Sequence, residues 1–307
     1  MRSHFCSSRW RLGLALSLLT VFLWGILPIA LSVTLQVLDV YTLTWFRFLI
    51  SFGLLAIYLA SRQQLPQWQK LRNAGLGLIV VATVFLGINY LLFVQGLTLT
   101  SPANAQVLIQ LAPVLFGIGA IAFFKERFNR YQSIGLSTLV LGLVLFFNEQ
   151  LQSLLTANST YLIGSGILVL AAAAWAVYAL AQKQLLRSLS SANVMLLIYG
   201  GCALLFTPVA TPSTILTLSL LHWGTLLFCG LNTLIAYGAF AEALEHWEAS
   251  RVSAVLALTP VVTLASVEIV SSLLPKWIAS EQLTLLGLIG AILVVSGSMA
   301  IALGRSR

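Results

Sequence analysis

Charged residues are scarce in this sequence of 307 residues, of which 16 are basic and 8 are acidic. They make up 8% of the chain, whereas a soluble domain carries about 25%. Hydrophobic residues make up 59%, and so few charged side chains cannot form the polar surface that a soluble fold needs around its core. The composition therefore excludes a soluble protein and predicts that lipid surrounds the chain.

Cysteine and catalytic motifs are equally sparse. Cys6, Cys202 and Cys229 lack CxxC or His-flanked spacing, so neither a disulfide framework, a metal site nor another cofactor is predicted. The apolar segments hold no Ser-His, paired-Asp or HExxH arrangement, and the chain has no ATP-binding P-loop. We therefore predict that the protein is neither an intramembrane protease nor a self-contained ATP-driven pump, and that it is not an enzyme.

Long apolar stretches occupy most of the chain. About 20 apolar residues in a helix cross the hydrocarbon core, and helix is the form that satisfies backbone groups there. Ten such stretches predict an all-α integral membrane protein with ten transmembrane helices, although nine or eleven remain possible. The stretches are 12–33, 41–60, 76–97, 101–124, 132–148, 162–182, 192–210, 221–241, 252–274 and 284–303.

Basic residues between these stretches predict the orientation. With the N-terminus in the cytoplasm, 14 of the 16 Lys and Arg residues fall in cytoplasmic segments, as the positive-inside rule requires. The exceptions are Lys276 in an outer loop and Arg47 within the second span. The net charge of +8 thus sets membrane orientation and does not indicate nucleic-acid binding. We predict a multi-pass protein of a bacterial inner membrane, with both termini cytoplasmic.

The two halves of the chain repeat each other. A shift of 147 places NYLLFVQGL over AYGAFAEAL and Pro113 over Pro260. After an eight-residue insertion, a shift of 155 places Gly135 and Gly142 on Gly290 and Gly297. Each half has five predicted spans, an odd number, so the second copy enters the membrane from the opposite side. Such an inverted repeat is typical of transporters in which two packings open one central site to either face.

Several segments resemble the drug/metabolite transporter superfamily, specifically its EamA-type members. They are FLWGILPIA, TWFRF and SPANAQVLIQLAPVLFGIGAIAFFKERFNRYQSIGLSTLVLGLVL. The second copy departs from the family pattern at its turn, which reads Ser280-Glu281-Gln282 where the first reads Lys125-Glu126-Arg127. The resemblance implies a cytoplasmic N-terminus at 1–11, one five-helix repeat at 12–148, a linker at 149–161, a second repeat at 162–303 and a cytoplasmic tail at 304–307.

The resemblance also implies a function. EamA-type proteins export, or in some members take up, amino acids and related small metabolites by alternating access. We therefore expect a secondary transporter with a small-molecule substrate, set in a lipid bilayer, and possible homodimers. A facilitator or channel, an uptake carrier for sugar phosphates, nucleotide sugars or cationic drugs, and a non-transporting scaffold stay open as alternatives.

Polar and aromatic side chains within spans are the candidates for the substrate pathway, because polar groups in lipid are costly and tend to face a cavity or a neighbouring helix. Similar transporters use spans one, three, four, six, eight and nine for their cavity. On these spans lie Trp24, Asn89, Tyr90, Gln95, Gln106, Gln110, Trp175, Tyr178, Asn232, Tyr237, Ser253 and Thr259. Instead of lining the pathway, the amide side chains could form hydrogen bonds to adjacent helices. The aromatic residues could instead pack in the core or belong to the interfacial aromatic belt.

Four further residues inside spans stand out. Pro113 and Pro260 each remove a helical hydrogen bond, and we expect a hinge or gate there, or a fixed kink. Arg47 and Glu268 are charges at similar depth, so an outer-side ion pair is possible; independent snorkelling is the alternative, and substrate contact by Arg47 is less favoured. Proton coupling is left open, since few titratable groups lie within the spans.

Small residues recur seven apart in the last span of each half. Gly135 and Gly142, and likewise Gly290 and Gly297, fall on one helical face. Small residues let helix backbones approach closely in membranes. We expect these glycines to serve contacts inside each half or dimerisation.

Overall fold

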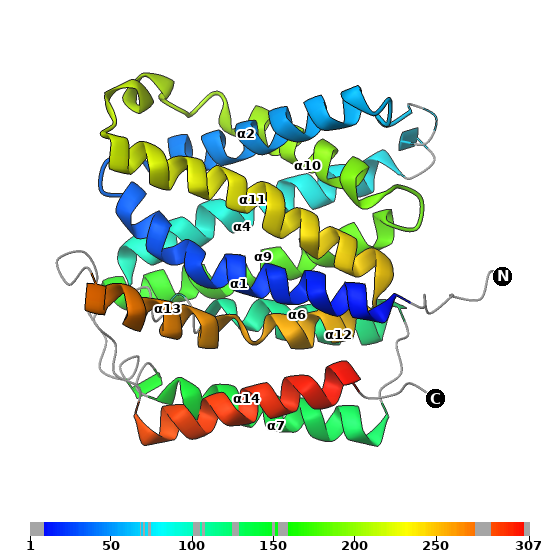
Figure 1. Ribbon diagram of the computed structural model, residues 1–307, viewed down its shortest axis with the longest axis vertical. Coiled ribbons are helices and arrows are strands. Elements are labelled where there is room, and N and C mark those ends of the chain that lie inside the picture. Colours follow the sequence, from blue (N-terminus) through cyan, green and yellow to red (C-terminus); the bar gives the residue numbers. More distant parts are fainter. Residues whose placement is uncertain are drawn as a thin grey trace.

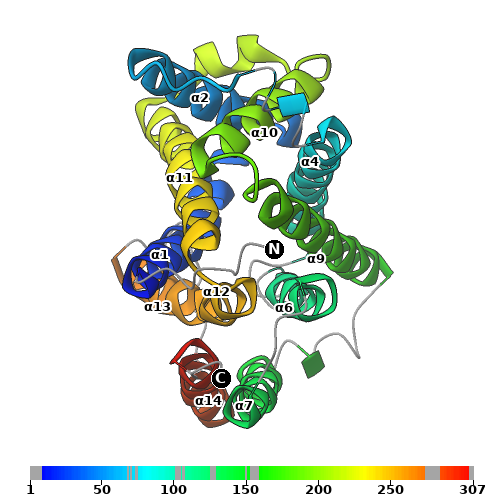
Figure 2. The ribbon, with the colours of Figure 1, turned by 90° about the vertical axis from the view of Figure 1, so that its right-hand side faces the viewer.

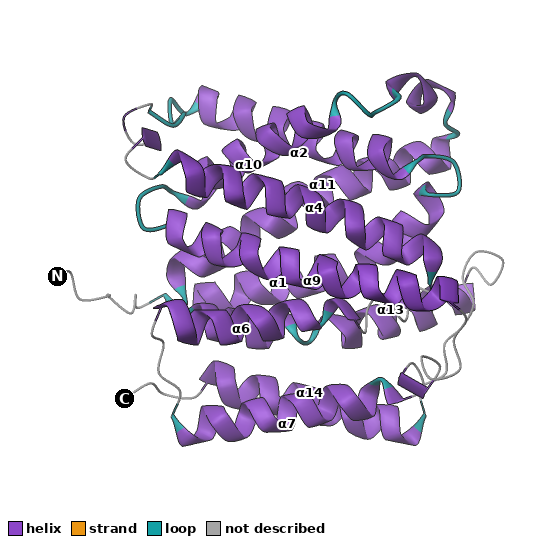
Figure 3. Cartoon of the chain, turned by 180° about the vertical axis from the view of Figure 1, so that it is seen from behind, coloured by secondary structure: helices purple, strands orange, loops and turns teal. Residues whose placement is uncertain are grey.

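The computed structural model describes residues 9–67, 69, 71–72, 75–100, 105, 108–124, 129–148, 151–152, 159–273 and 284–303. Within these residues the regular elements are helices, joined by loops (Figure 3). The predicted all-helical class is confirmed for this part of the chain. The elements are α1 (Trp10–Thr34), α2 (Val40–Ser61), α4 (Leu76–Leu99), α6 (Leu111–Phe124), α7 (Arg130–Phe146), α9 (Ser159–Leu185), α10 (Ser191–Phe206), a 3-10 helix η1 (Pro212–Thr217), α11 (Leu220–His246), α12 (Ala249–Leu256), α13 (Thr259–Leu273) and α14 (Leu285–Leu303).

Polar side chains set the start of several helices. The carboxylate of Asp39 accepts hydrogen bonds from the backbone N–H groups of Tyr41 and Thr42, both at 2.9 Å, and so caps α2. Asn129 and Gln132 form a capping box at the start of α7. These caps satisfy N–H groups that have no partner inside the helix, so they fix where the apolar run begins to wind.

Length and composition make the helices suited to a membrane. In the described part, six helical segments are long and apolar enough to span, one of them running through α12 and α13 as Ala249–Val270. Four shorter apolar helices are α6, α7, α10 and α14. Large apolar side chains also face outward: Leu220 is 91% and Phe123 75% exposed. A soluble protein rarely exposes so much contiguous apolar surface, whereas lipid accepts it.

The helices lie side by side in one bundle, with their long axes running across the view (Figure 1). Seen from one end, α1 and α11 form one wall, α4 and α9 form the opposite wall, and α2 with α10 lies across them (Figure 2). On the other side of these walls lie α6 and α12, and beyond them α7 and α14 pack on each other (Figure 2). The helix α1 begins and α14 ends at the same end of the bundle (Figure 1).

The span predicted at 252–274 is broken. Helix α12 ends at Leu256, a turn covers 257–258, and α13 begins at Thr259. Pro260 lies in the first turn of α13, where a residue without N–H is tolerated. The hydroxyl of Thr259 donates to the carbonyl of Leu256 at 2.6 Å. The carbonyl of Leu256 would accept a helical hydrogen bond from residue 260, but Pro260 has no N–H to donate. The Thr259 hydroxyl takes its place as donor.

The repeated glycines join the two halves of one chain, which corrects the expectation that they serve contacts inside each half. They lie where α7 crosses α14 within one chain. A Cβ placed on Gly290 would lie 2.2 Å from the backbone nitrogen of Phe146, and one on Gly142 would lie 2.6 Å from that of Val294. Only hydrogen fits at such distances, so the repeat of small residues permits direct backbone packing.

Candidate functional site

A cavity lies between the two walls of the bundle. The empty space within it, including its open mouth, amounts to about 740 Å³. The cavity is lined by Trp24, Leu27, Pro28, Leu31, Arg47, Asn89, Tyr90, Phe93, Val94, Ile109, Gln110, Ala112, Pro113, Trp175, Tyr237, Leu256 and Thr259. Most of these are apolar, with a few polar groups among them, as is usual for a ligand site.

Seven of the twelve pathway candidates line this cavity. They are Trp24, Asn89, Tyr90, Gln110, Trp175, Tyr237 and Thr259, and Pro113 and Arg47 join them. They come from α1, α2, α4, α6, α9, α11 and α13 and the turn before α6. The sequence thus brings together residues that lie more than 200 positions apart.

The other candidates lie elsewhere. Gln95 is exposed on α4, and Gln106 falls outside the described residues. Tyr178 on α9 is fully buried and does not line the cavity; its hydroxyl lies 3.7 Å from the sulfur of Met195. The amide nitrogen of Asn232 donates to the carbonyl of Leu23 at 2.7 Å, which ties α11 to α1.

Ser253 faces a smaller apolar space. That space lies between α6, α7, α12 and α14, and the residues around it are almost all apolar. The hydroxyl of Ser253 donates to the carbonyl of Ser250 at 2.9 Å, within its own helix. Ser253 therefore has no contact with the central cavity in this conformation.

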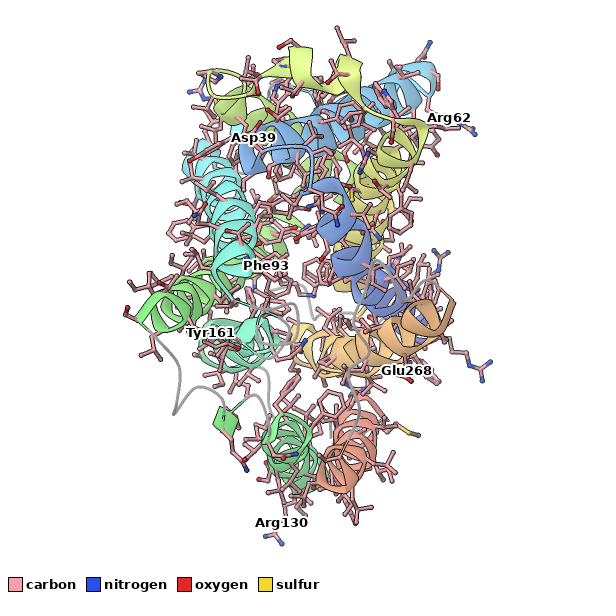
Figure 4. All side chains as sticks on the ribbon, turned by 90° about the vertical axis from the view of Figure 1, so that its left-hand side faces the viewer. Asp39, Arg62, Phe93, Arg130, Tyr161 and Glu268 are labelled. Carbon is pink, nitrogen blue, oxygen red and sulfur yellow. The ribbon has the colours of Figure 1, made fainter. Side chains whose placement is uncertain are left out.

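Aromatic rings from α1, α4, α9 and α11 form a continuous surface of the cavity, which we call the aromatic wall. Trp24 meets Trp175 edge to face at 5.8 Å between ring centroids and Tyr237 at 4.9 Å. Tyr237 lies 5.6 Å from Tyr90, which continues the wall toward α2. Phe93, labelled in Figure 4, adds a further ring from α4. Such offset and edge-on pairs stabilise each other beyond their area, so the wall is a rigid, largely apolar surface.

Arg47 lies inside this site although its side chain is charged. It is 2% exposed, its Nε donates to the hydroxyl of Thr233 at 2.9 Å, and one terminal nitrogen donates to the hydroxyl of Tyr90 at 3.4 Å. Its guanidinium carbon also lies 4.6 Å from the centre of the Tyr90 ring. Glu268 is exposed on α13 (Figure 4). In this conformation the described residues show no Arg47–Glu268 ion pair, because the two side chains face different surroundings.

The lining of the cavity extends toward the end of the bundle where α1 ends, and polar contacts join the helices at the opposite end, which we call the closed end. The lining comes from the later halves of α1 and α4 and the earlier half of α2. At the closed end, Lys183 on α9 donates to the carbonyls of Leu244 and, at 2.9 Å, Trp247. Ser191 at the start of α10 bonds Glu242 through its hydroxyl and Glu245 through its N–H. These contacts tie α9 and α10 to the last turns of α11.

Sequence reasoning missed the apolar part of the lining. Leu27, Leu31 and Val94 carry no chemical signature that separates a cavity wall from ordinary core packing. Pro28 does carry one, because it lies in the interior of α1 and removes a helical hydrogen bond there. The same signal could therefore have found it.

Comparisons with known proteins agree with this architecture. The sequence matches the model of the EamA-like transporter family at residues 11–148 and 162–303. YhbE of Escherichia coli, named "Uncharacterized inner membrane transporter", is 41% identical over 96% of this chain and 92% of its own. An "Uncharacterized transporter" of Haemophilus influenzae is 37% identical over 96% and 95%, respectively.

More distant proteins extend the likeness. A Salmonella typhimurium protein named "Probable amino-acid metabolite efflux pump" is 27% identical over 92% of both chains. A solved crystal structure aligns with 96% of this chain and 98% of its own at a TM-score of 0.71 and 17% identity. At that identity the last likeness shows the fold alone.

Proposed function

Because this chain belongs to the EamA-like transporter family, it is a membrane transporter and not an enzyme, and we propose that it exports small metabolites, amino acids or related compounds, as a secondary transporter. The cavity lined by helices from both halves of the chain carries this proposal, because alternating access needs a central site between the two repeats. The name of the Salmonella relative supports efflux of amino-acid metabolites.

We further propose ten spans arranged as two inverted repeats, over 12–148 and 162–303. Helix contacts support this arrangement, because exchanging the halves maps the most extensively packed pairs of helices onto one another. The pair α4–α9 corresponds to α11–α1, and α4–α10 corresponds to α11–α2. The pairs α2–α10 and α7–α14 correspond to themselves. A twofold relation in the membrane plane would produce this pattern.

We also propose that the protein lies in the inner membrane with both termini in the cytoplasm. The described basic residues outside the spans support this orientation, because they belong to the end of the bundle where α1 begins. They are Arg9, Arg11, Arg62, Arg72, Arg130, Lys183, Arg187 and Arg251. Reporter fusions at both ends of the chain test the proposal: both should report the cytoplasm, and a periplasmic signal from either would contradict it.

Counterflow in proteoliposomes tests the transport activity. Vesicles loaded with an unlabelled amino acid should accumulate the labelled one transiently above equilibrium, since a carrier exchanges substrate through an alternating site. A channel would equilibrate the label without overshoot, and a scaffold would leave it outside. Replacement of Trp24 by alanine should remove part of the cavity wall and reduce the overshoot, whereas replacement of the exposed Leu220 by alanine should not.

A further inference from the structure

Arg47 gives the cavity a single fixed charge. Of the described residues that line it, Arg47 alone carries a charge at neutral pH, and no Asp or Glu joins it there. Its hydroxyl partners on Thr233 and Tyr90 are neutral, so they orient the guanidinium without cancelling its charge. A buried cation without an anion is costly. The planar guanidinium is suited to a carboxylate, which it can bind through two parallel N–H groups.

Neutral oxygens supply the remaining polarity of the cavity. The side-chain oxygen of Gln110 is buried without a hydrogen-bond partner, and the residue is only 5% exposed. A buried acceptor left without a donor is rare and costly. It lies in the lining, so the N–H group of a bound molecule would satisfy it.

Prolines add backbone acceptors to the same surface. Pro28 and Pro113 have no N–H to donate to the carbonyls four residues earlier, which are those of Trp24 and Ile109. Both of these residues line the cavity. The described lining thus combines one cation with neutral polar groups, and no Asp or Glu among the described residues lines the cavity to receive a cationic group.

We propose that the substrates are small carboxylates of net charge −1 that carry an N–H donor and an apolar side group, of the kind that an N-acylated amino acid represents. The carboxylate docks on Arg47, the N–H group faces Gln110, and the apolar group packs on the wall formed by Trp24 and Trp175. This substrate class rests on the proposed transport function and makes it more specific.

Charge balance explains why the monoanion is preferred. When the cavity closes and water leaves, the charge of a monoanion and the charge of Arg47 add to a net charge of zero. A zwitterionic amino acid leaves a net charge of +1, with its ammonium group facing neutral side chains and no carboxylate among the described lining residues. A cationic ester leaves +2 and has no carboxylate for the guanidinium. Interactions between charges strengthen as water is excluded, so these differences matter most in the occluded state.

The test compares four forms of one compound in proteoliposome uptake: N-acetylphenylalanine, phenylalanine, N-acetylphenylalanine methyl ester and phenylalanine methyl ester. Wild-type protein should prefer the monoanion over the zwitterion by at least about tenfold, with the neutral and cationic esters below both. Arg47→Gln should abolish the preference for the acid over its neutral ester. Thermal melting of each variant, without substrate, checks that it is folded.

Gln110→Glu gives a second test that does not depend on losing Arg47. It adds a negative charge to the lining, so the sum becomes zero with the zwitterion, and the preference should reverse toward phenylalanine. Gln36→Glu, the same change in the exposed loop between α1 and α2, should keep the wild-type ranking.

The outcomes separate this inference from the transport function. If wild-type protein carries the zwitterion best, or if neither Arg47→Gln nor Gln110→Glu alters the ranking, the inference is overturned and the proposed transport function stands. If folded wild-type protein accumulates none of the four forms, this inference is overturned, and the counterflow experiment with other amino acids decides the transport function separately.

Discussion

The crossing of α7 and α14 predicts a sharp effect of adding one methyl group. Gly290→Ala would place a Cβ 2.2 Å from the nitrogen and 2.6 Å from the Cα of Phe146, and 2.7 Å from the carbonyl oxygen of Gly142. All three are backbone atoms, so no side-chain rotation can relieve the contact. The two helices must separate by about 1 Å to restore ordinary contact distances.

The size of the effect follows from two opposing contributions. Overpacking costs about 1–3 kcal/mol, and backbone contacts this short belong at the upper end of that range. Alanine recovers about 1 kcal/mol through its higher helix propensity. The free energy of unfolding should therefore fall by about 2 kcal/mol, which lowers the melting temperature by roughly 4–8 °C by analogy with soluble domains.

Thermal unfolding in detergent, followed by the fraction that remains monodisperse in size exclusion, measures this change. The matched control is Gly166→Ala on α9, where a Cβ would meet nothing within 4 Å, and its melting temperature should stay unchanged or rise slightly. Equal melting temperatures for the two variants would refute the argument. A lower oligomeric mass at unchanged stability would instead assign the glycine to a dimer contact.

Two further predictions concern the ends of the helices. Asp39→Ala should destabilise the protein by about 1 kcal/mol through loss of the α2 cap. Burial raises the pKa of the Asp39 carboxyl, but hydrogen bonds from Thr42, Thr211 and Tyr41 outweigh it and hold the pKa below its ordinary value. The stabilisation is therefore full above about pH 4 and is lost as pH falls further, so melting curves of wild type and variant should converge in acid. Lys183→Met should loosen the closed end, because it removes the bonds from Lys183 to the carbonyls of Leu244 and Trp247. In a protein without native cysteines that carries Leu27→Cys, an impermeant maleimide applied from that side should label the cysteine faster when Lys183→Met is present. Equal labelling rates with and without Lys183→Met would contradict the gating role.

Much of the fold could be predicted because helix in lipid follows from composition. Each apolar stretch overlaps described helical residues; for α7 the prediction of 132–148 differs from Arg130–Phe146 by two residues at each end, whereas α6 begins at Leu111 within the stretch predicted at 101–124. The resemblance to EamA-type transporters is confirmed by the family match. The break between α12 and α13 was not predicted, although Pro260 indicated a perturbed helix. Its position depends on the bond between Thr259 and Leu256, which is a matter of local competition between side chain and backbone.

The site was less accessible to sequence reasoning, and Arg47 shows why. A charge in a span can face lipid headgroups, a paired acid or a cavity, and only the packing of other helices decides among them. Its partners Thr233 and Tyr90 lie 186 and 43 residues away. The polar candidates on α4 illustrate the same difficulty, because Asn89 lines the cavity while Gln95, six residues later, is exposed on the same helix.

The contacts at the closed end determine how readily the proposed alternating access can proceed. There the aromatic ring of Trp247 covers Gly13 so closely that a Cβ would lie 2.7 Å from the Trp247 side chain. The polar bonds of Lys183 and Ser191 are only partly buried, so water can replace them when the end opens, at a net cost of about 1 kcal/mol each. Water cannot replace the ring contacts of the aromatic wall deeper in the bundle in this way. Opening should therefore begin where α9, α10 and α11 meet, with the wall of Trp24 and Trp175 moving as a unit.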